Sequence, residues 1–322
     1  MPTQLILWEV PLLNIETQCE GWFSISAFKV DKTGEEVSGS RREPVPPFKN
    51  LITDAGLNRM GDNADWLNWC QVGSGSTAPS ASDTALVSRV NGSSSKLSTA
   101  GTVQSSAPFY VSRTITYRFP QGAAAGNLSE VAVGWASSGG LFSRALILDA
   151  LGSPTAITVL PDELLDVTYQ FRQYMPAVDG TQDLTLRAVV HAVVSRACAV
   201  TTTSGNTIWF ISEQGTSAGT TGVLGATAAF QGPIGSITAE GPGGTNAPPS
   251  TLSALAYSSG SLFRDHVVSF SNSDGNLSGG IGAIRVKMGI GVYQFGFTPA
   301  IMKTADDILS LTFRHSWSRK TL

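Results

Sequence analysis

Apolar and polar residues alternate with a period of two along much of the chain, and the first clear run is Trp22–Val30. Phe23, Ile25 and Ala27 fall on one face of this segment, while polar residues such as Ser24 lie between them. Alternation of this kind, bounded by Gly, Pro, Ser and Asn, is typical of half-buried strands. We therefore expect a largely antiparallel all-β protein. Further strands are expected at residues 66–72, 110–119, 128–135, 142–148, 157–160, 165–174, 184–194, 207–212, 266–270, 283–289, 293–297 and 308–317.

One short helix is expected at Thr53–Met60. Either Thr53 or Asp54 can cap its N-terminus, and Gly61 lies where the helix would end. Leu57 lies on the side that we expect to be buried against the sheet.

Several segments of the first half of the chain recur in the second half, in the same order. The matched segments are residues 73–79 with 241–248, 113–119 with 266–270, 126–129 with 275–278, and 162–171 with 306–315. This repetition predicts two tandem, internally duplicated antiparallel β-sandwich-like domains, with the short helix in the first.

The repeats also predict the domain boundaries. We expect an N-terminal arm at 1–19, a first β-domain at 20–175 and a second, diverged β-domain at 183–322, joined by a linker that contains Pro176 and Gly180. The arm carries the apolar segment Leu5–Trp8, which can dock either in the chain's own core or in a groove of a partner.

The composition argues against several classes of function. Charged residues make up 14% of the 322 positions, against about 25% in typical domains, so the surface is polar without being ionic and suits packing against neighbouring subunits. The net charge is −3 and the longest basic run is Arg41-Arg42, so we expect no nucleic-acid partner.

No membrane span or export signal is expected. The most apolar window, residues 186–200, contains Arg187, His191 and Arg196, which makes it too short and too charged to cross a bilayer. The first ten residues lack a basic region ahead of an apolar stretch. We expect synthesis and assembly in a host cytoplasm.

No pattern of catalytic or metal-binding residues is recognisable. The three histidines have no metal-ligand spacing, the three cysteines form no Cys-x-x-Cys pair, and neither a Gly-x-Ser-x-Gly nor a phosphate-binding loop is present. We expect no enzymatic activity, no catalytic residue, no cofactor and no metal, and we expect the thiols to be buried. The histidines are His191, His266 and His315, and the cysteines are Cys19, Cys70 and Cys198.

Two carboxylate pairs and seven tryptophans are the candidates for a glycan site. Glycan-cleaving enzymes need two acids that flank a groove, but Asp162 with Glu163 and Asp306 with Asp307 are adjacent residues in turns before strands, which favours a structural role. Core or interface packing is favoured over a sugar platform for the tryptophans. They are Trp8, Trp22, Trp66, Trp69, Trp135, Trp209 and Trp317.

Five segments resemble structural proteins of tailed-bacteriophage tails, over roughly residues 20 to 172. The segments are Asn50–Gly61, Cys70–Pro79, Asp83–Leu86, Leu128–Gly134 and Leu141–Ala145. The resemblance implies a fibre, baseplate or tail-tip subunit located in the virion tail, and it brings no catalytic residues.

We therefore expect a structural subunit that acts through contacts with other tail or baseplate proteins and with copies of itself. A trimer is favoured, because three chains with two copies each would present six similar domains to a sixfold tail. Two alternatives stay open. One is a module that binds a host surface glycan through loops Gln214–Gly222 or Gly241–Pro249, and the other is a capsid decoration or head fibre protein.

Overall fold

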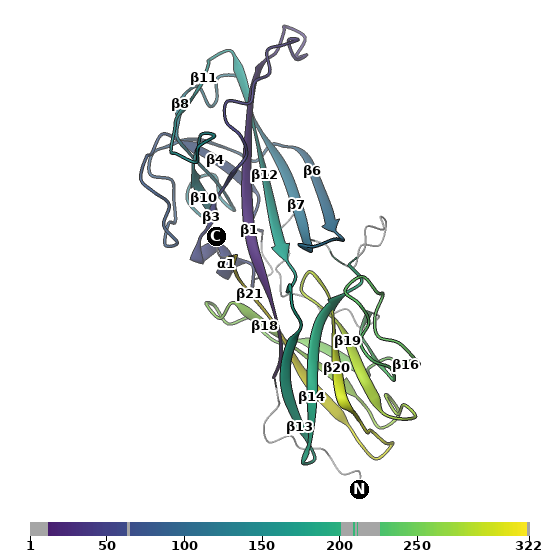
Figure 1. The fold of residues 1–322 in the computed structure, drawn as a ribbon. Helices are drawn as coiled ribbons and strands as arrows, with labels where there is room; N and C mark the ends of the chain where they lie inside the picture. The colour runs from purple at the N-terminus through teal and green to yellow at the C-terminus, as the bar shows by residue number, and fades with distance from the viewer. Residues whose placement is uncertain (1–11, 63–64, 201–208, 210, 212–225, 321–322) are drawn as a thin grey trace.

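A computed structural model of the chain describes residues 12–62, 65–200, 209, 211 and 226–320 (Figure 1). As predicted, the protein is all-β and sandwich-like, and one short helix, α1 (Asp54–Arg59), occurs among the described residues. The molecule is elongated, with one group of sheets at each end and the long strand β1 (Leu12–Lys29) running between them.

One large sheet extends through both halves of the molecule. In order across the sheet it contains β17 (Thr251–Ala254), β18 (Phe263–Phe270), β21 (Leu309–Arg319), β1, β12 (Glu163–Tyr174), β7 (Tyr110–Phe119) and β6 (Lys96–Gln104), and β2 (Phe48–Lys49) also pairs with β1.

Two smaller sheets complete the sandwiches. The sheet of the first sandwich is β3 (Leu51–Ile52), β10 (Leu141–Leu146), β9 (Glu130–Gly134), β4 (Trp69–Gly73) and β5 (Arg89–Ser93). That of the second is β13 (Gly180–Leu186), β14 (Val189–Cys198), β20 (Gly291–Ile301), β19 (Ile281–Met288), β15 (Ala228–Phe230) and β16 (Asn246–Ala247). A separate pair joins β8 (Gly126–Leu128) to β11 (Ile157–Val159).

Strand β1 belongs to both sandwiches. Its first part, from Leu12 to Cys19, pairs in parallel with β21, and its second part, from Gln18 to Lys29, pairs antiparallel with β12. Burial alternates along most of its length, so that its odd-numbered side chains from Leu13 to Ala27 lie in the interior. Most buried apolar residues of both sandwiches accordingly form one continuous core.

The two sandwiches share most of their strand order, although β13, β2 and the β8–β11 pair have no counterpart among the described strands of the other copy. The order β3-β10-β9-β4-β5 matches β14-β20-β19-β15-β16, and β12-β7-β6 matches β21-β18-β17. Even the register is kept, because Leu165 faces Phe119 in the first copy and Leu309 faces Phe270 in the second. This correspondence is what the sequence repeats predict for a duplicated unit.

The predicted helix is present and its cap is Thr53. The Thr53 hydroxyl accepts a hydrogen bond of 2.8 Å from the backbone N–H of Gly56, and it also donates one of 2.7 Å to the carbonyl oxygen of Leu141. The capping residue therefore ends the preceding strand, starts the helix and attaches both to β10.

The structure differs from the expected elements at the start of the second copy and at the start of β1. The strand expected at residues 184–194 is a hairpin, β13–β14, whose two turn residues Arg187 and Ala188 have φ of 49° and 61°. Turns of this type normally carry Asn or Gly, so the sequence lacked the usual signal. Residues 12–19, expected in the N-terminal arm, are part of β1, so the expected boundary at residue 20 falls inside a strand. The strand expected at 207–212 lies mostly outside the described residues.

Candidate functional site

The junction between the two sandwiches is the candidate functional site. A network of hydrogen bonds between buried polar side chains crosses the junction through β1. The Gln173 side chain of β12 donates a hydrogen bond of 2.7 Å to Thr17 Oγ1, which lies 2.9 Å from His315 Nε2 on β21. The hydroxyl of Tyr293, on β20, lies 3.4 Å from the same ring nitrogen. This network thus links three strands of the large sheet to the small sheet of the second sandwich.

Helix α1 of the first sandwich binds the second sandwich through Asn58. The Asn58 Oδ1 atom accepts hydrogen bonds from the hydroxyl of Tyr257 at 2.9 Å and from the backbone N–H of Gly260 at 2.5 Å. Arg264 of β18 donates a hydrogen bond of 2.8 Å to the carbonyl oxygen of Gly61, which lies just after the helix. A side chain at Gly61 would collide with the Tyr257 ring, which shows how closely the two parts approach.

The end of β21 makes a third set of contacts across the junction. The indole of Trp317, which is 1% exposed, stacks on Tyr257 and donates a hydrogen bond of 2.8 Å to the carbonyl oxygen of Leu57. Arg319 donates to the carbonyl oxygen of Ile52 and pairs with Asp54. All of these groups are bound to one another, so the chemistry of the junction is that of attachment.

A hollow of about 450 Å³ opens beside the junction. Its lining includes Glu16 and Gln18 of β1, with Phe109, Tyr174 and Lys320 around them. The Lys320 ammonium lies 3.7 Å from the centre of the Tyr174 ring, so cationic and aromatic groups are combined on one wall.

A buried ion pair in the first sandwich holds the loop at residues 74–88. Glu130 and Arg144 are 0% and 1% exposed, and their side chains are 2.9 Å apart. Glu130 Oε1 accepts hydrogen bonds from the backbone N–H groups of Gly75 and Ser88, at 3.1 and 2.7 Å, and Arg144 pairs with Asp83 at 2.6 Å. The two side chains fix residues 74–88 on the small sheet.

The second copy replaces this ion pair with an amide. Gln294 of β20 accepts a hydrogen bond of 2.8 Å from the backbone N–H of Gly235 and returns one of 2.9 Å to the carbonyl oxygen of the same residue. Loop Gly241–Pro249 lies further along the chain and contains β16. Loop Gln214–Gly222 lies outside the described residues.

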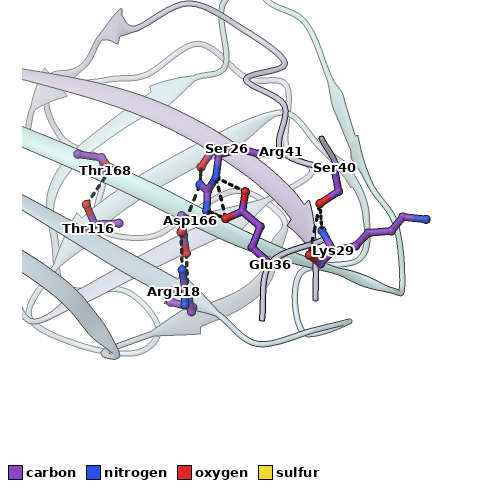
Figure 2. A network of polar contacts seen from close by, with 9 residues as sticks. All are labelled: Ser26, Lys29, Glu36, Ser40, Arg41, Thr116, Arg118, Asp166 and Thr168. Carbon is purple, nitrogen blue, oxygen red and sulfur yellow. Dashed lines mark hydrogen bonds and ion pairs between the residues drawn. The ribbon is translucent and has the colours of Figure 1, made fainter. Parts of the chain in front are cut away.

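Charged residues of neighbouring strands also pair on the outer face of the large sheet. Arg118 of β7 holds Asp166 of β12 in two hydrogen bonds of 2.8 Å, and Arg41 bridges Asp166 to Glu36 (Figure 2). In the second copy the corresponding strands carry the charges the other way round, with Arg314 on β21 and Asp265 on β18. No local sequence pattern reveals the pairs between strands, because their partners are far apart in sequence.

The first carboxylate pair lies where β12 begins, with Asp162 in the preceding turn and Glu163 as the first residue of the strand. Asp162 pairs with Lys29 at 2.7 Å, and Glu163 pairs with Arg42 at 2.8 Å. Glu163 also accepts a hydrogen bond of 2.8 Å from the backbone N–H of Leu160. The Arg42 guanidinium holds the pKa of Glu163 below its ordinary value.

The second pair repeats this arrangement before β21. Asp306 is exposed, whereas Asp307 accepts a hydrogen bond of 2.9 Å from the backbone N–H of Thr304 and pairs with Arg187. The Thr304 hydrogen bond, and then Arg187, hold the pKa of Asp307 below its ordinary value. In each pair the buried carboxylate is bound to an arginine and to its own turn, which is a structural role.

The histidines lie on three different strands. Nδ1 of His191, on β14, is 2.6 Å from the carbonyl oxygen of Pro299. His315 belongs to the hydrogen-bond network that crosses the junction. His266, on β18, is 0% exposed and neither ring nitrogen has a hydrogen-bond partner in the described part of the chain. Within those residues no three His, Cys, Asp or Glu side chains are grouped so as to hold a metal ion.

The three thiols and half of the described tryptophans are packed inside. Cys19, Cys70 and Cys198 are free and buried, and burial raises the pKa of each thiol. Trp66 lies edge-on to Phe142 and Phe171, with ring centres 4.5 and 4.9 Å apart. Trp209 and Trp317 are also buried, Trp22, Trp69 and Trp135 are half-buried, and Trp8 lies outside the described residues.

The fold and its junction define an all-β protein in which two sandwiches share one strand and one core. No family model, no curated protein and no solved structure matches the chain. Among the described residues no helix has the length and apolar character needed to cross a bilayer.

Proposed function

We propose that the chain is a structural subunit of a tailed-bacteriophage tail, in a fibre, baseplate or tail tip, and that it acts by holding other subunits without enzymatic activity. The observation that carries this proposal is the sharing of β1. A flexible linker would let two domains turn independently, whereas the strand pairs on both of its edges with different halves of the chain. The two sandwiches thus form a stiff spacer.

The energetic argument for stiffness comes from the junction contacts. Separating the sandwiches would break the parallel ladder from Leu12 to Cys19 and expose Leu13 and Ile15, which are 0% and 3% exposed. Burial of a large apolar side chain contributes about 1.5–3 kcal/mol. The loss of these two alone makes an opened state rare.

The resemblance of Asn50–Gly61 and Cys70–Pro79 to tail proteins supports a place in the virion tail. The expected partners are other tail or baseplate proteins and further copies of the chain, with a trimer favoured on symmetry grounds. The low charge of the sequence, 14% of residues, suits broad contacts between subunits.

Antibodies raised against the recombinant chain test this placement on intact particles. Gold label on the tail is the expected result. Label on the head would replace the proposal with a capsid decoration protein, and absence of label from disrupted particles would reject a virion role. Light scattering of the purified chain measures the oligomer, for which we expect three copies.

A second candidate function, binding of a host surface glycan, is favoured by the hollow beside the junction. Phe109 and Tyr174 provide aromatic surface there, and Glu16 and Gln18 provide groups that can bind hydroxyls. Glycan-array binding by the wild type that is lost in Phe109→Ala would support this function. Val178→Ala, at the exposed rim of the same hollow, is the matched control.

A further inference from the structure

A pocket of about 270 Å³ opens at the end of the second sandwich, away from the junction. The hairpin β13–β14, the end of β20 and the start of β21 surround it. Val189 and Met302 are 45% and 64% exposed, although they are apolar. Its apolar lining consists mainly of Leu186, Val189, Ile301, Met302, Ile308 and Leu309.

A strand edge with no described partner lies next to this pocket. β21 begins at Leu309, but its parallel pairing with β1 begins only at Thr312, opposite Leu12. Residues Leu309–Leu311 pair with β18 on their other side. In the described part of the chain nothing pairs with them on the β1 side, and such an edge can accept a further strand.

β1 points directly at this edge. The side chain of Gln182, on β13, donates a hydrogen bond of 2.9 Å to the carbonyl oxygen of Leu12, and β13 continues from there to Leu186 at the pocket. Residues 1–11 precede Leu12 and lie outside the described range. A continuation of β1 towards lower residue numbers would follow both β13 and the edge of β21.

We propose that residues 5–9 of this chain occupy the pocket by extending β1 along the edge of β21. Leu7 precedes Leu12 by as many residues as Asp307 precedes Thr312, so the segment reaches the pocket in the existing register. In β1 the odd-numbered residues face the interior. The same alternation directs Leu5 and Leu7 into the apolar pocket and leaves Trp8 on the outer side.

The charges of the pocket fit the same segment. Arg187, Lys303 and Asp307 line it, and Arg187 pairs with Asp307. The Lys303 ammonium donates a hydrogen bond of 2.8 Å to Asn276 Oδ1, which is not a carboxylate. The three charged residues of the lining thus provide two cations and one carboxylate. Glu9, the next odd-numbered position after Leu7, supplies a second carboxylate.

Engineered cysteines test the register directly. The variant Trp8→Cys with Ile308→Cys places two thiols at positions that the proposal pairs, and Thr3→Cys with Ile308→Cys is the control. The three native cysteines are buried and will not compete. After mild oxidation of dilute protein, we expect at least tenfold more intrachain disulfide in the first variant than in the control, by peptide mass spectrometry. Equal yields, no disulfide, or disulfide-linked dimers that place the segment on a second copy would each overturn the proposal.

Hydrogen exchange tests the side-chain alternation without new thiols. In Leu5→Ser with Leu7→Ser, we expect amide exchange of residues 186–191 and 309–311 to accelerate at least tenfold. Ile6→Ser with Trp8→Ser, which changes the outward positions, should have a much smaller effect. Unchanged exchange in the first variant, or the same change in both, contradicts the proposal.

Discussion

The indole nitrogen of Trp317 donates a 2.8 Å hydrogen bond to the carbonyl oxygen of Leu57, which joins β21 of the second sandwich to α1 of the first. Neither group meets solvent, so the bond has no aqueous substitute if it is broken. Helix α1 of the first sandwich thus forms part of the surface against which the second sandwich packs.

Replacing Trp317 with phenylalanine tests this bond. Trp317→Phe keeps an aromatic ring against Tyr257 but leaves the carbonyl oxygen of Leu57 without its donor. An unsatisfied buried acceptor costs about 1–3 kcal/mol, so we expect a loss of this size in the free energy of unfolding, measured with urea. Trp66→Phe is the control, because Trp66 is also 1% exposed but its indole nitrogen has no hydrogen-bond partner among the described residues. Equal losses in the two variants would contradict the role of the bond.

A methyl group at Gly61 tests how closely the sandwiches approach. In Gly61→Ala the added carbon collides with the Tyr257 ring, and overpacking of this kind costs about 1–3 kcal/mol. We expect a clear fall in melting temperature in differential scanning calorimetry. Gly243→Ala is matched to it, since its added carbon would meet open space. A melting temperature as high as that of wild type in Gly61→Ala would show that the junction yields.

Acid should destabilise the protein through His266. Burial lowers the pKa of its imidazole from 6.5 to about 4, so the unfolded chain binds more protons than the folded chain between these values. Stability is therefore fully present above pH 6.5 and falls as the pH is lowered towards 4, by about 3 kcal/mol in total.

The variant His266→Leu isolates this contribution. Urea titrations between pH 7 and 4.5 should show that most of the loss of stability in that range disappears in the variant. Carboxylates such as Glu163, with lowered pKa values, act mainly at lower pH. An unchanged pH dependence in the variant would assign the effect to other groups.

The buried ion pair of the first sandwich gives a fourth prediction. Glu130→Gln leaves the guanidinium of Arg144 buried with only Asp83 as an acidic partner. Breaking a buried pair costs about 3–5 kcal/mol, and we expect faster hydrogen exchange throughout residues 74–88. Asp179→Asn, which breaks the half-exposed pair with Arg196, should cost less than about 1 kcal/mol. Slow exchange in the loop of Glu130→Gln would mean that the backbone alone holds it.

Local patterns explain what could be predicted from the sequence. The period-two alternation of Trp22–Val30 and of residues 165–174 indicated strands, and Thr53 indicated the start of the helix. The paired repeats at 162–171 and 306–315 indicated equivalent strands, which the matching registers of β12 and β21 agree with.

Other features have no local signal. Residues 12–19 were expected in an N-terminal arm, because the partner that makes them a strand, β21, lies nearly three hundred positions away, as the 298 positions between Thr17 and His315 show. β6 is mostly exposed and polar, so it lacks the apolar alternation that reveals a half-buried strand. The junction was missed for the same reason, because each of its bonds joins distant parts of the chain.

The parallel pairing of β1 with β21 also has a consequence for biosynthesis. During translation β1 leaves the ribosome long before β21, so its outer edge stays unpaired while the first sandwich is already able to form around β12 and β7. Only when the second half has been made can the shared sheet close. Slow or interrupted translation of that half would leave a nascent chain with an open edge, ready to aggregate with its neighbours.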